Sequence, residues 1–248
     1  LAVPDRANDL SGMLRSALRA RAQLIALMTL TSMCAGGGCA RGPATEPAPE
    51  ARRALLLDSS APFWRAAAPD NYDVRIETTK GSFVLEIIRA SAPRGADRFY
   101  RLVRAGYYDD TRFTRVVSGF IAQFGISGDS AVNAVWSHRG FFDDAVHQSN
   151  ARGTIAFAMT GPNERTTQLY INLADNLRLD DQGFVPIGRV THGMDVVDAL
   201  YSGYGEKSGG GVRAGNQGPL LSGGNGYVDA HFPLLDHLIS ARICPCPQ

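Results

Sequence analysis

Cysteine is scarce in this chain and is confined to its two ends. The 248 residues contain four cysteines, Cys34, Cys39, Cys244 and Cys246, and the long stretch between the two pairs has none. A disulfide framework through the body of the protein is therefore excluded. The sequence Cys244-Pro-Cys246 lacks the two-residue spacer of the usual redox and metal motifs. We expect residues 244–248 to form a tail.

Excess charge of one sign is also lacking. The formal net charge is +1, which gives no electrostatic support for a nucleic-acid partner. The sequence has no Walker-type glycine loop, no His/Cys set with metal-ligand spacing and no Ser-His-Asp signature. Its histidines are scattered and indicate surface or loop positions. We therefore expect no metal, no cofactor and no nucleic acid.

The first forty residues are typical of a targeting segment. Three arginines follow Met13, and an apolar stretch at 24–33 leads to small residues up to 40, as in a secretory or lipoprotein signal. The apolar stretch is short for a membrane span. Residues 1–12 do not fit the pattern, and we interpret them as upstream read-through. The alternative is that 13–40 form an apolar helix that the mature protein keeps.

Export would place the protein in the periplasm or cell envelope. Cys39 and Cys34 are candidates for lipid attachment, although neither has the leucine three residues earlier that such sites favour. A lipid there would tether the protein to a membrane. Residues 41–70 are rich in Pro and Ala and predict a tether, in which 55–57 and 63–64 pack on the outside of the next domain.

Residues 71–243 have the pattern of one β-rich domain. Hydrophobic alternation predicts strands at 72–78 and 82–88 with a turn at Lys80-Gly81, and a helix begins at Pro93 and ends at Gly106. Further strands are expected at 153–159, 168–173, 185–190 and 234–243, with a second helix at 193–201 and a glycine-rich loop at 202–226. Many strands with two helices suggest a closed antiparallel barrel capped by helices.

The segment 113–125 is the most informative part of the domain. It places Arg115 in an apolar and aromatic run, with Gln123 on the same strand face and Phe120 on the other. Phe120 joins the other two only if the chain turns at Ser118-Gly119. A guanidinium over an apolar floor beside an amide suits the binding of a peptide group, and no nucleophile or acid–base pair accompanies it.

Several segments between 72 and 243, in the correct order, resemble a cyclophilin, a peptidyl-prolyl cis–trans isomerase. They are Thr79–Phe83, Ala96–Val103, Phe113–Gly125, Arg152–Asn163, Thr167–Asn172, Phe184–Val190 and Gly193–Asp195. The resemblance implies a mainly β fold, a closed eight-stranded antiparallel barrel capped by two α-helices. It also implies that the chain is an enzyme acting on proline-containing polypeptides without a cofactor.

The resemblance assigns roles to individual residues. It implies that Arg115, Phe120 and Gln123 are catalytic. The residues implied to bind the substrate are Ile121, Phe157, Ala158, Met159, Gln168, Tyr170, Arg178, Leu179 and Phe184. Four positions depart from the family pattern: Thr114 and Phe184 replace histidines, Arg178 replaces a tryptophan and Met159 replaces an asparagine. The last three departures resemble bacterial members, and the lost tryptophan predicts weak cyclosporin binding.

These residue types suit isomerisation. Rotation about an X–Pro bond crosses a barrier on the order of 18–20 kcal/mol, because amide resonance is lost at the twisted state. The nitrogen becomes a hydrogen-bond acceptor there, so a guanidinium aimed at it would stabilise the transition state selectively. An apolar pocket would hold the proline ring while the acyl side rotates.

Taken one at a time, the same residues have plainer interpretations. Arg115 could be a solvated strand residue, the apolar residues could be ordinary core, and Arg178 could line the pocket rim or simply face water. Two other functions also stay open. One is a proline-binding module or envelope chaperone with little turnover, and the other is a structural lipoprotein whose tether matters more than its groove.

Overall fold

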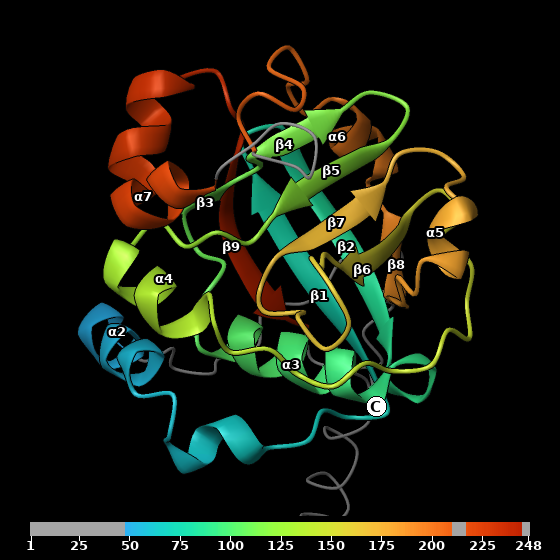
Figure 1. Ribbon diagram of the computed structural model, residues 1–248, viewed down its shortest axis with the longest axis horizontal. Coiled ribbons are helices and arrows are strands. Elements are labelled where there is room, and N and C mark those ends of the chain that lie inside the picture. Colours follow the sequence, from blue (N-terminus) through green and yellow to red (C-terminus); the bar gives the residue numbers. More distant parts are fainter. Residues whose placement is uncertain (1–47, 210–216, 245–248) are drawn as a thin grey trace, which may run out of the picture. The chain divides into compact units, whose positions relative to one another are not determined.

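The computed structural model describes residues 48–209 and 217–244 (Figure 1). The sequence-based expectations for residues 1–47, including Cys34 and Cys39, lie outside these ranges. Among the described residues, no helix combines the length and apolar character needed to cross a membrane.

One antiparallel sheet forms the centre of the described domain. Its nine strands follow the order β3-β9-β1-β2-β8-β6-β7-β5-β4. Their bounds are β1 Asn71–Thr78, β2 Gly81–Ile88, β3 Thr111–Arg112, β4 Arg115–Val117, β5 Ile121–Phe124, β6 Thr154–Phe157, β7 Leu169–Asn172, β8 Pro186–His192 and β9 His237–Ile243. The antiparallel, mainly β architecture expected from the sequence is thus confirmed.

The sheet curls but does not close through hydrogen bonds. Its two end strands, β3 and β4, are separated in sequence only by Phe113 and Thr114, so the chain itself joins the two edges. β3 pairs with β9, whereas β4 pairs with β5, and no described ladder links β3 to β4. The expectation of a closed eight-stranded barrel was wrong in strand number and closure. The sheet has nine strands, and it stays open because the chain leaves the β3–β9 ladder before it enters the β4–β5 ladder.

Alternating burial explains why the first hairpin forms. In β1, Tyr72, Val74 and Ile76 are buried while the residues between them are more exposed, which is the period of a half-buried strand. The β1–β2 turn pairs Thr78 with Gly81, whose φ of 126° suits a residue without a Cβ. The buried side chains of this hairpin belong to the main hydrophobic cluster. On its other edge, β2 pairs with β8.

The helices outnumber the two that were expected. Those two are α3 Pro93–Arg104 and α6 Met194–Asp198. The others are α2 Pro49–Leu57, α4 Ser130–Trp136, α5 Arg178–Asp181 and α7 Gly218–His231, with short 3-10 turns η1 Pro62–Arg65 and η2 Arg89–Ser91. α7 falls mostly within the segment expected to be a glycine-rich loop, so that expectation was wrong over 218–226.

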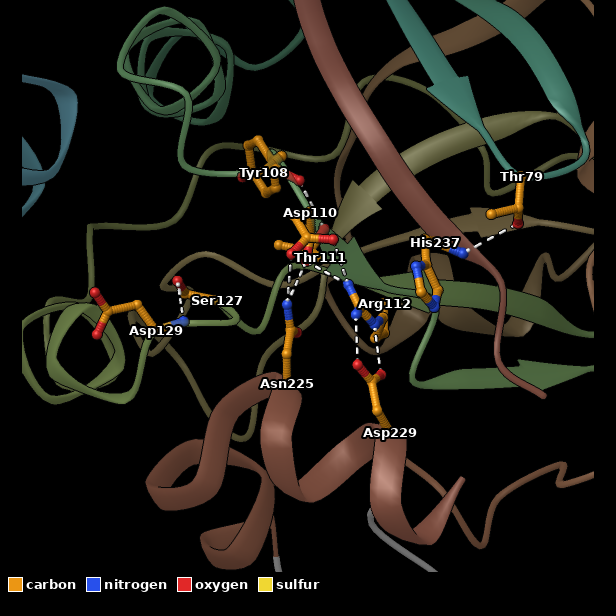
Figure 2. Close-up of polar contacts among 10 residues, drawn as sticks. All are labelled: Thr79, Tyr108, Asp110, Thr111, Arg112, Ser127, Asp129, Asn225, Asp229 and His237. Carbon is orange, nitrogen blue, oxygen red and sulfur yellow. Dashed lines mark hydrogen bonds and ion pairs between the residues drawn. The ribbon is translucent and has the colours of Figure 1, made fainter. Parts of the chain in front are cut away.

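Tertiary contacts rather than helix propensity hold α7 in place. Figure 2 shows Arg112 of β3 donating from Nε and Nη2 to the two carboxylate oxygens of Asp229, at 2.8 and 2.7 Å. Asn225 donates to the backbone oxygen of Asp110 at 2.8 Å. Gly224 breaks the helical path at φ 55°, where a Cβ would meet a backbone oxygen at 2.2 Å. Glycine is therefore required at the kink.

The part of the expected tether that is described folds against the domain. Leu56 of α2 is buried, and its backbone oxygen accepts a hydrogen bond from the indole of Trp136 at 2.8 Å. The ring of Trp64, in η1, lies 4.5 Å from the ring of Trp136. The expected packing of 55–57 and 63–64 is thus seen, but 48–70 belong to the folded domain because their apolar side chains are partly buried there.

The C-terminal boundary also differs from the expectation. Cys244 is 6% exposed, it is disulfide-bonded, and its backbone N–H donates to the oxygen of Asp73 at 2.8 Å. It was expected to begin a tail, but it extends the pairing of β9 with β1 by one residue.

Candidate active site

Arg115 and Gln123 lie directly opposite each other on β4 and β5. Arg115 Nη1 donates to Gln123 Oε1 at 3.2 Å. The strands are joined by a turn in which Gly119 has a φ of 69°, so the condition under which Phe120 can join these two residues is met. The turn returns Phe120 to the same side, and the guanidinium carbon of Arg115 lies 5.5 Å from the centre of its ring.

A small apolar cluster, separate from the main core, lies beside this arginine. Its buried members come from β5, β6, β7 and α5, and three partly buried residues pack around them. The buried members are Ile121, Ala156, Tyr170 and Leu179, and the others are Phe120, Ala158 and Phe184. We refer to this cluster as the pocket, because its partly buried members present apolar surface against which a small ring could pack.

The hydroxyl of Tyr170 does not add charge to this pocket. It donates to Asn150 Oδ1 at 2.8 Å, and burial raises the pKa of Tyr170 well above its ordinary value. The ring of Phe184 packs edge-on against Tyr170, with centroids 5.8 Å apart. The pocket wall is therefore neutral, which strengthens electrostatic contacts made by a neighbouring cation.

A chain of amides forms the polar side of the site. Gln123 Nε2 donates to Gln168 Oε1 at 2.9 Å, and Gln168 Nε2 donates to Gln217 Oε1 at 2.8 Å. Gln217 also donates to the backbone oxygen of Gly209 at 2.9 Å. The amide of Gln123 is thereby fixed with its oxygen toward Arg115.

Glu206 is the residue least expected in this site. Its Oε1 accepts a hydrogen bond from Arg115 Nη2 at 2.7 Å, and the side chain of Arg115 is 13% exposed. The loop carrying Glu206 is pinned by Ser208, whose hydroxyl donates to the backbone oxygen of Thr114 at 2.7 Å. A Cβ at Gly209 would lie 2.3 Å from that of Arg115, so only glycine allows this approach.

Arg115 keeps donors for a ligand in this arrangement. A guanidinium carries five N–H donors, of which two are used by Gln123 and Glu206. Within the described residues, the buried Nε of Arg115 has no hydrogen-bond partner. The fork is therefore oriented by two neighbours but not saturated by them.

The remaining predicted site residues divide into two groups. Arg178 is exposed, and its guanidinium carbon lies 4.9 Å from the centre of the Phe120 ring, so it stands at the pocket rim while facing water. Met159 lies beside Gly183, next to the pocket residue Phe184. Phe157 does not line the pocket, because strand alternation turns its side chain into the main core, where it is 1% exposed.

Sequence reasoning missed three residues of the site. Glu206 lies in a glycine-rich loop, Gln217 precedes α7, and Asn150 lies in an irregular segment. None has a periodic pattern around it, and each reaches the site through contacts distant in sequence. Across residues 48–209 and 217–244, no cluster of side chains has the composition of a metal site.

Comparison with known proteins identifies the family of this chain. A family model described as cyclophilin type peptidyl-prolyl cis-trans isomerase/CLD matches residues 73–214, more than half of the chain. A peptidyl-prolyl cis-trans isomerase of Streptomyces antibioticus is 35% identical over 140 residues, covering 51% of this chain and 81% of that protein. An isomerase-like protein of Neurospora crassa is 34% identical over 128 residues, with coverages of 50% and 78%.

Solved structures agree on the fold. A cyclophilin type isomerase of Cryptosporidium parvum superposes with a TM-score of 0.51 and 22% identity, covering 71% of this chain and 99% of that one. A cyclophilin of Hirschia baltica also gives a TM-score of 0.51, with 17% identity and coverages of 79% and 80%. At these identities the likeness concerns the fold alone.

Proposed function

The chain belongs to the cyclophilin family of peptidyl-prolyl cis–trans isomerases, and we propose that it performs this reaction in the groove built on β4, β5 and β7. It is an enzyme whose substrates are proline-containing polypeptides. The observation that carries the assignment of the groove is the Arg115 guanidinium, held at once against Gln123 and over the ring of Phe120 beside a neutral apolar pocket.

Arg115 would act on the nitrogen of the X–Pro bond. In the planar amide this nitrogen is a poor acceptor, because its lone pair is delocalised into the carbonyl. When the bond twists, the lone pair localises, and a donor of the guanidinium fork can bind it. Because this contact forms only in the twisted state, it lowers the barrier without tightening ground-state binding.

The apolar cluster would hold the proline ring. The side chains of Ile121, Tyr170 and Leu179 are each less than 10% exposed, so packing holds them in place. A proline ring could therefore pack against them without moving them. Phe120 supplies the floor beneath both the ring and Arg115. Gln123 and Gln168 then offer amide groups to the substrate backbone, next to the Ala158 end of β6.

Glu206 would set the orientation of the arginine. Gln123 accepts a hydrogen bond from Nη1 of Arg115, and the carboxylate of Glu206 accepts one from Nη2. Together they limit the rotamers that Arg115 can adopt. The same ion pair could hold the guanidinium back from a substrate. That possibility and the rim position of Arg178 favour a second candidate function, a proline-segment binding module with little turnover.

The decisive experiment is the cis-to-trans rate of a short X–Pro peptide with the full chain, for the parent and Arg115→Ala. We expect the variant to lose about a hundredfold in kcat/KM, as when one preorganised donor is removed elsewhere. Arg75→Ala, a partly exposed arginine on β1, is the matched control and should behave as the parent. A folded parent without acceleration would leave the binding-module function as the better account.

The cellular setting is a separate part of the proposal. We propose that the protein acts on exported polypeptides in the periplasm or cell envelope, with residues 13–40 as signal and Cys39 or Cys34 as the lipid-bearing residue. Mass spectrometry of the mature N-terminus tests this, since a diacylated cysteine and a free cut near Ala40 differ in mass. Weak cyclosporin binding remains a prediction, which Arg178→Trp should strengthen in a direct titration.

A further inference from the structure

A second concave surface lies on α3, away from the groove. In Figure 1, α3 lies at the opposite end of the view from β4 and β5. Two adjoining cavities, of about 620 and 590 Å³, share Arg98, Arg101 and Gly140 in their walls. We name this surface the basic cleft, and it includes no residue assigned to isomerisation.

The basic cleft carries cations on both sides. Arg98 and Arg101 lie one turn apart on the same face of α3, and Arg139 approaches from the segment after α4. Within the described ranges, no carboxylate lies within ion-pair distance of any of the three. One carboxylate, Asp97, lines the second cavity, but it is paired with Arg89. Asp144 accepts from the backbone of α3 and pairs with Arg94.

Arg98 is fixed before any ligand arrives. Its guanidinium carbon lies 5.3 Å from the ring centre of Trp136 and 5.2 Å from that of Phe141. Its Nη2 donates to the backbone oxygen of Arg139 at 3.0 Å. A guanidinium held by stacking loses little conformational freedom when it binds an anion, so this site is preorganised.

The cost of this arrangement is electrostatic. Burial, followed by the positive charges of Arg101 and Arg139, lowers the pKa of Arg98 to about 10. Cations removed from water are ordinarily paired with an anion in the same protein. Here the described residues supply only Asp97, which lines the second cavity but is paired with Arg89, so the three arginines leave positive charge for a bound anion.

We propose that the basic cleft binds an acidic segment of a polypeptide, with carboxylates on Arg98, Arg101 and Arg139. Guanidinium forks match carboxylate geometry, and charge complementarity selects an acidic partner. The cavities are far larger than the ~30 Å³ share of one water molecule, so they admit several side chains. The exposed ring of Phe142, in the second cavity, offers an apolar contact beside the charges.

A polypeptide fits this surface better than a membrane does. Arg98 lines both cavities, with its guanidinium against the rings of Trp136 and Phe141, and a concave surface suits a single side chain better than a flat array of lipid headgroups. A single side chain on an extended segment can enter such a recess. Because the surface is remote from the groove, an acidic segment could bind there while a proline elsewhere in the same chain is isomerised.

The chain contains two tryptophans, Trp64 and Trp136, and both line the basic cleft. Intrinsic tryptophan fluorescence of the full chain therefore reports on this surface directly. The probe is a proline-free hexapeptide, acetyl-Gly-Glu-Leu-Glu-Gly-Glu-amide, and its control has Gln in place of each Glu. We expect a saturable change with the Glu peptide only, which weakens as salt is raised.

Two variants test the assignment of residues. Arg139→Ala removes an exposed cation from the cleft and should weaken binding about tenfold, the loss expected for one charge-assisted hydrogen bond. Arg104→Ala removes the same charge one turn beyond the cavities on α3 and should leave binding unchanged. Arg98→Lys keeps the charge but not the planar fork, so it should also bind more weakly.

Four results would overturn the proposal. They are no saturable change with the Glu peptide, equal binding of the Gln peptide, equal loss in Arg104→Ala and Arg139→Ala, or full displacement by inorganic phosphate at the peptide's own half-saturating concentration. A signal obtained only with anionic phosphatidylserine vesicles would assign the surface to membranes instead. Because the readout is binding and not isomerisation, the result does not depend on Arg115.

Discussion

Replacing Asp229 with alanine should loosen α7 and measurably destabilise the protein. The carboxylate accepts two hydrogen bonds from Arg112, at 2.8 and 2.7 Å, and the side chain of Arg112 is only 5% exposed. Without Asp229, the buried guanidinium keeps only its contacts to Asp110 (Figure 2). A buried cation that loses half of its partners carries a desolvation cost that water cannot fully relieve.

The magnitude follows from the exposure of the two partners. Breaking a fully buried pair costs roughly 3–5 kcal/mol, whereas exposed pairs contribute about 0–1 kcal/mol. Asp229 is 48% exposed while Arg112 is buried, so this pair lies between those limits. We expect Asp229→Ala to lower the free energy of unfolding by about 1–3 kcal/mol.

Denaturant unfolding of the parent and the variant, followed by circular dichroism, measures this difference. Asp195→Ala is the matched control, since Asp195 is exposed on α6 and has no ion pair among the described residues. A double-mutant cycle with Arg112→Ala should give a coupling of about 1 kcal/mol or more. If the two single effects are additive, or if Asp229→Ala is as stable as the control, the Arg112–Asp229 ion pair contributes nothing to stability.

The pH dependence of the same variant gives an independent check. Hydrogen bonds from Arg112 are the main reason why the pKa of Asp229 lies below its ordinary value. A lowered folded-state pKa means that the stabilisation is present above the unfolded carboxyl pKa, about 3.9, and is lost as pH falls through the folded value. The gap in stability between parent and Asp229→Ala should therefore be full at pH 7 and shrink in acid.

Three further outcomes are expected. Glu206→Ala should lower kcat/KM by about tenfold, because Arg115 would be less well oriented. Lys207→Ala should leave kcat/KM unchanged, and stopped-flow assays with the X–Pro peptide would measure both. Trp136→Phe removes the hydrogen bond to a carbonyl of α2 and should cost about 1–2 kcal/mol in denaturant unfolding. Gly125→Ala places a Cβ 2.5 Å from a backbone oxygen at φ 104°, so it should lower the melting temperature strongly.

The sequence predicted the parts of the fold that depend on local pattern. The β1–β2 hairpin and α3 follow from alternation, a glycine turn and a proline at the helix start, and both ends were placed within a few residues. Strand parity also predicted that Arg115 and Gln123 share a face, although the structure places them on two strands that pair across the turn at Gly119. These features need only neighbours in the sequence, which is why pattern reasoning reached them.

The helix α7 could not be predicted in the same way. Its sequence contains several glycines, each costing about 1 kcal/mol of helix propensity relative to alanine. The helix forms because Arg112 and Asp110 anchor Asp229 and Asn225, and all four contacts span more than a hundred residues. Glu206 and Gln217 entered the site through the same kind of distant contact, and no periodicity in the chain marks them.

The open seam of the sheet gives these distant contacts a common role. The seam lies at Phe113 and Thr114, between two strands that no described ladder joins, and Arg115 begins the second of them. α7 is bound to β3 through the ion pair of Asp229 with Arg112. Gln217, the residue before α7, accepts a hydrogen bond from Gln168 in the site. The loop at 205–209 holds Thr114 and Arg115 themselves. Segments with many buried contacts and hydrogen bonds open less readily than exposed segments do. The contacts made by α7, Gln217 and the loop at 205–209 therefore hold together the open side of the sheet. They also fix Arg115, on which isomerisation is proposed to depend.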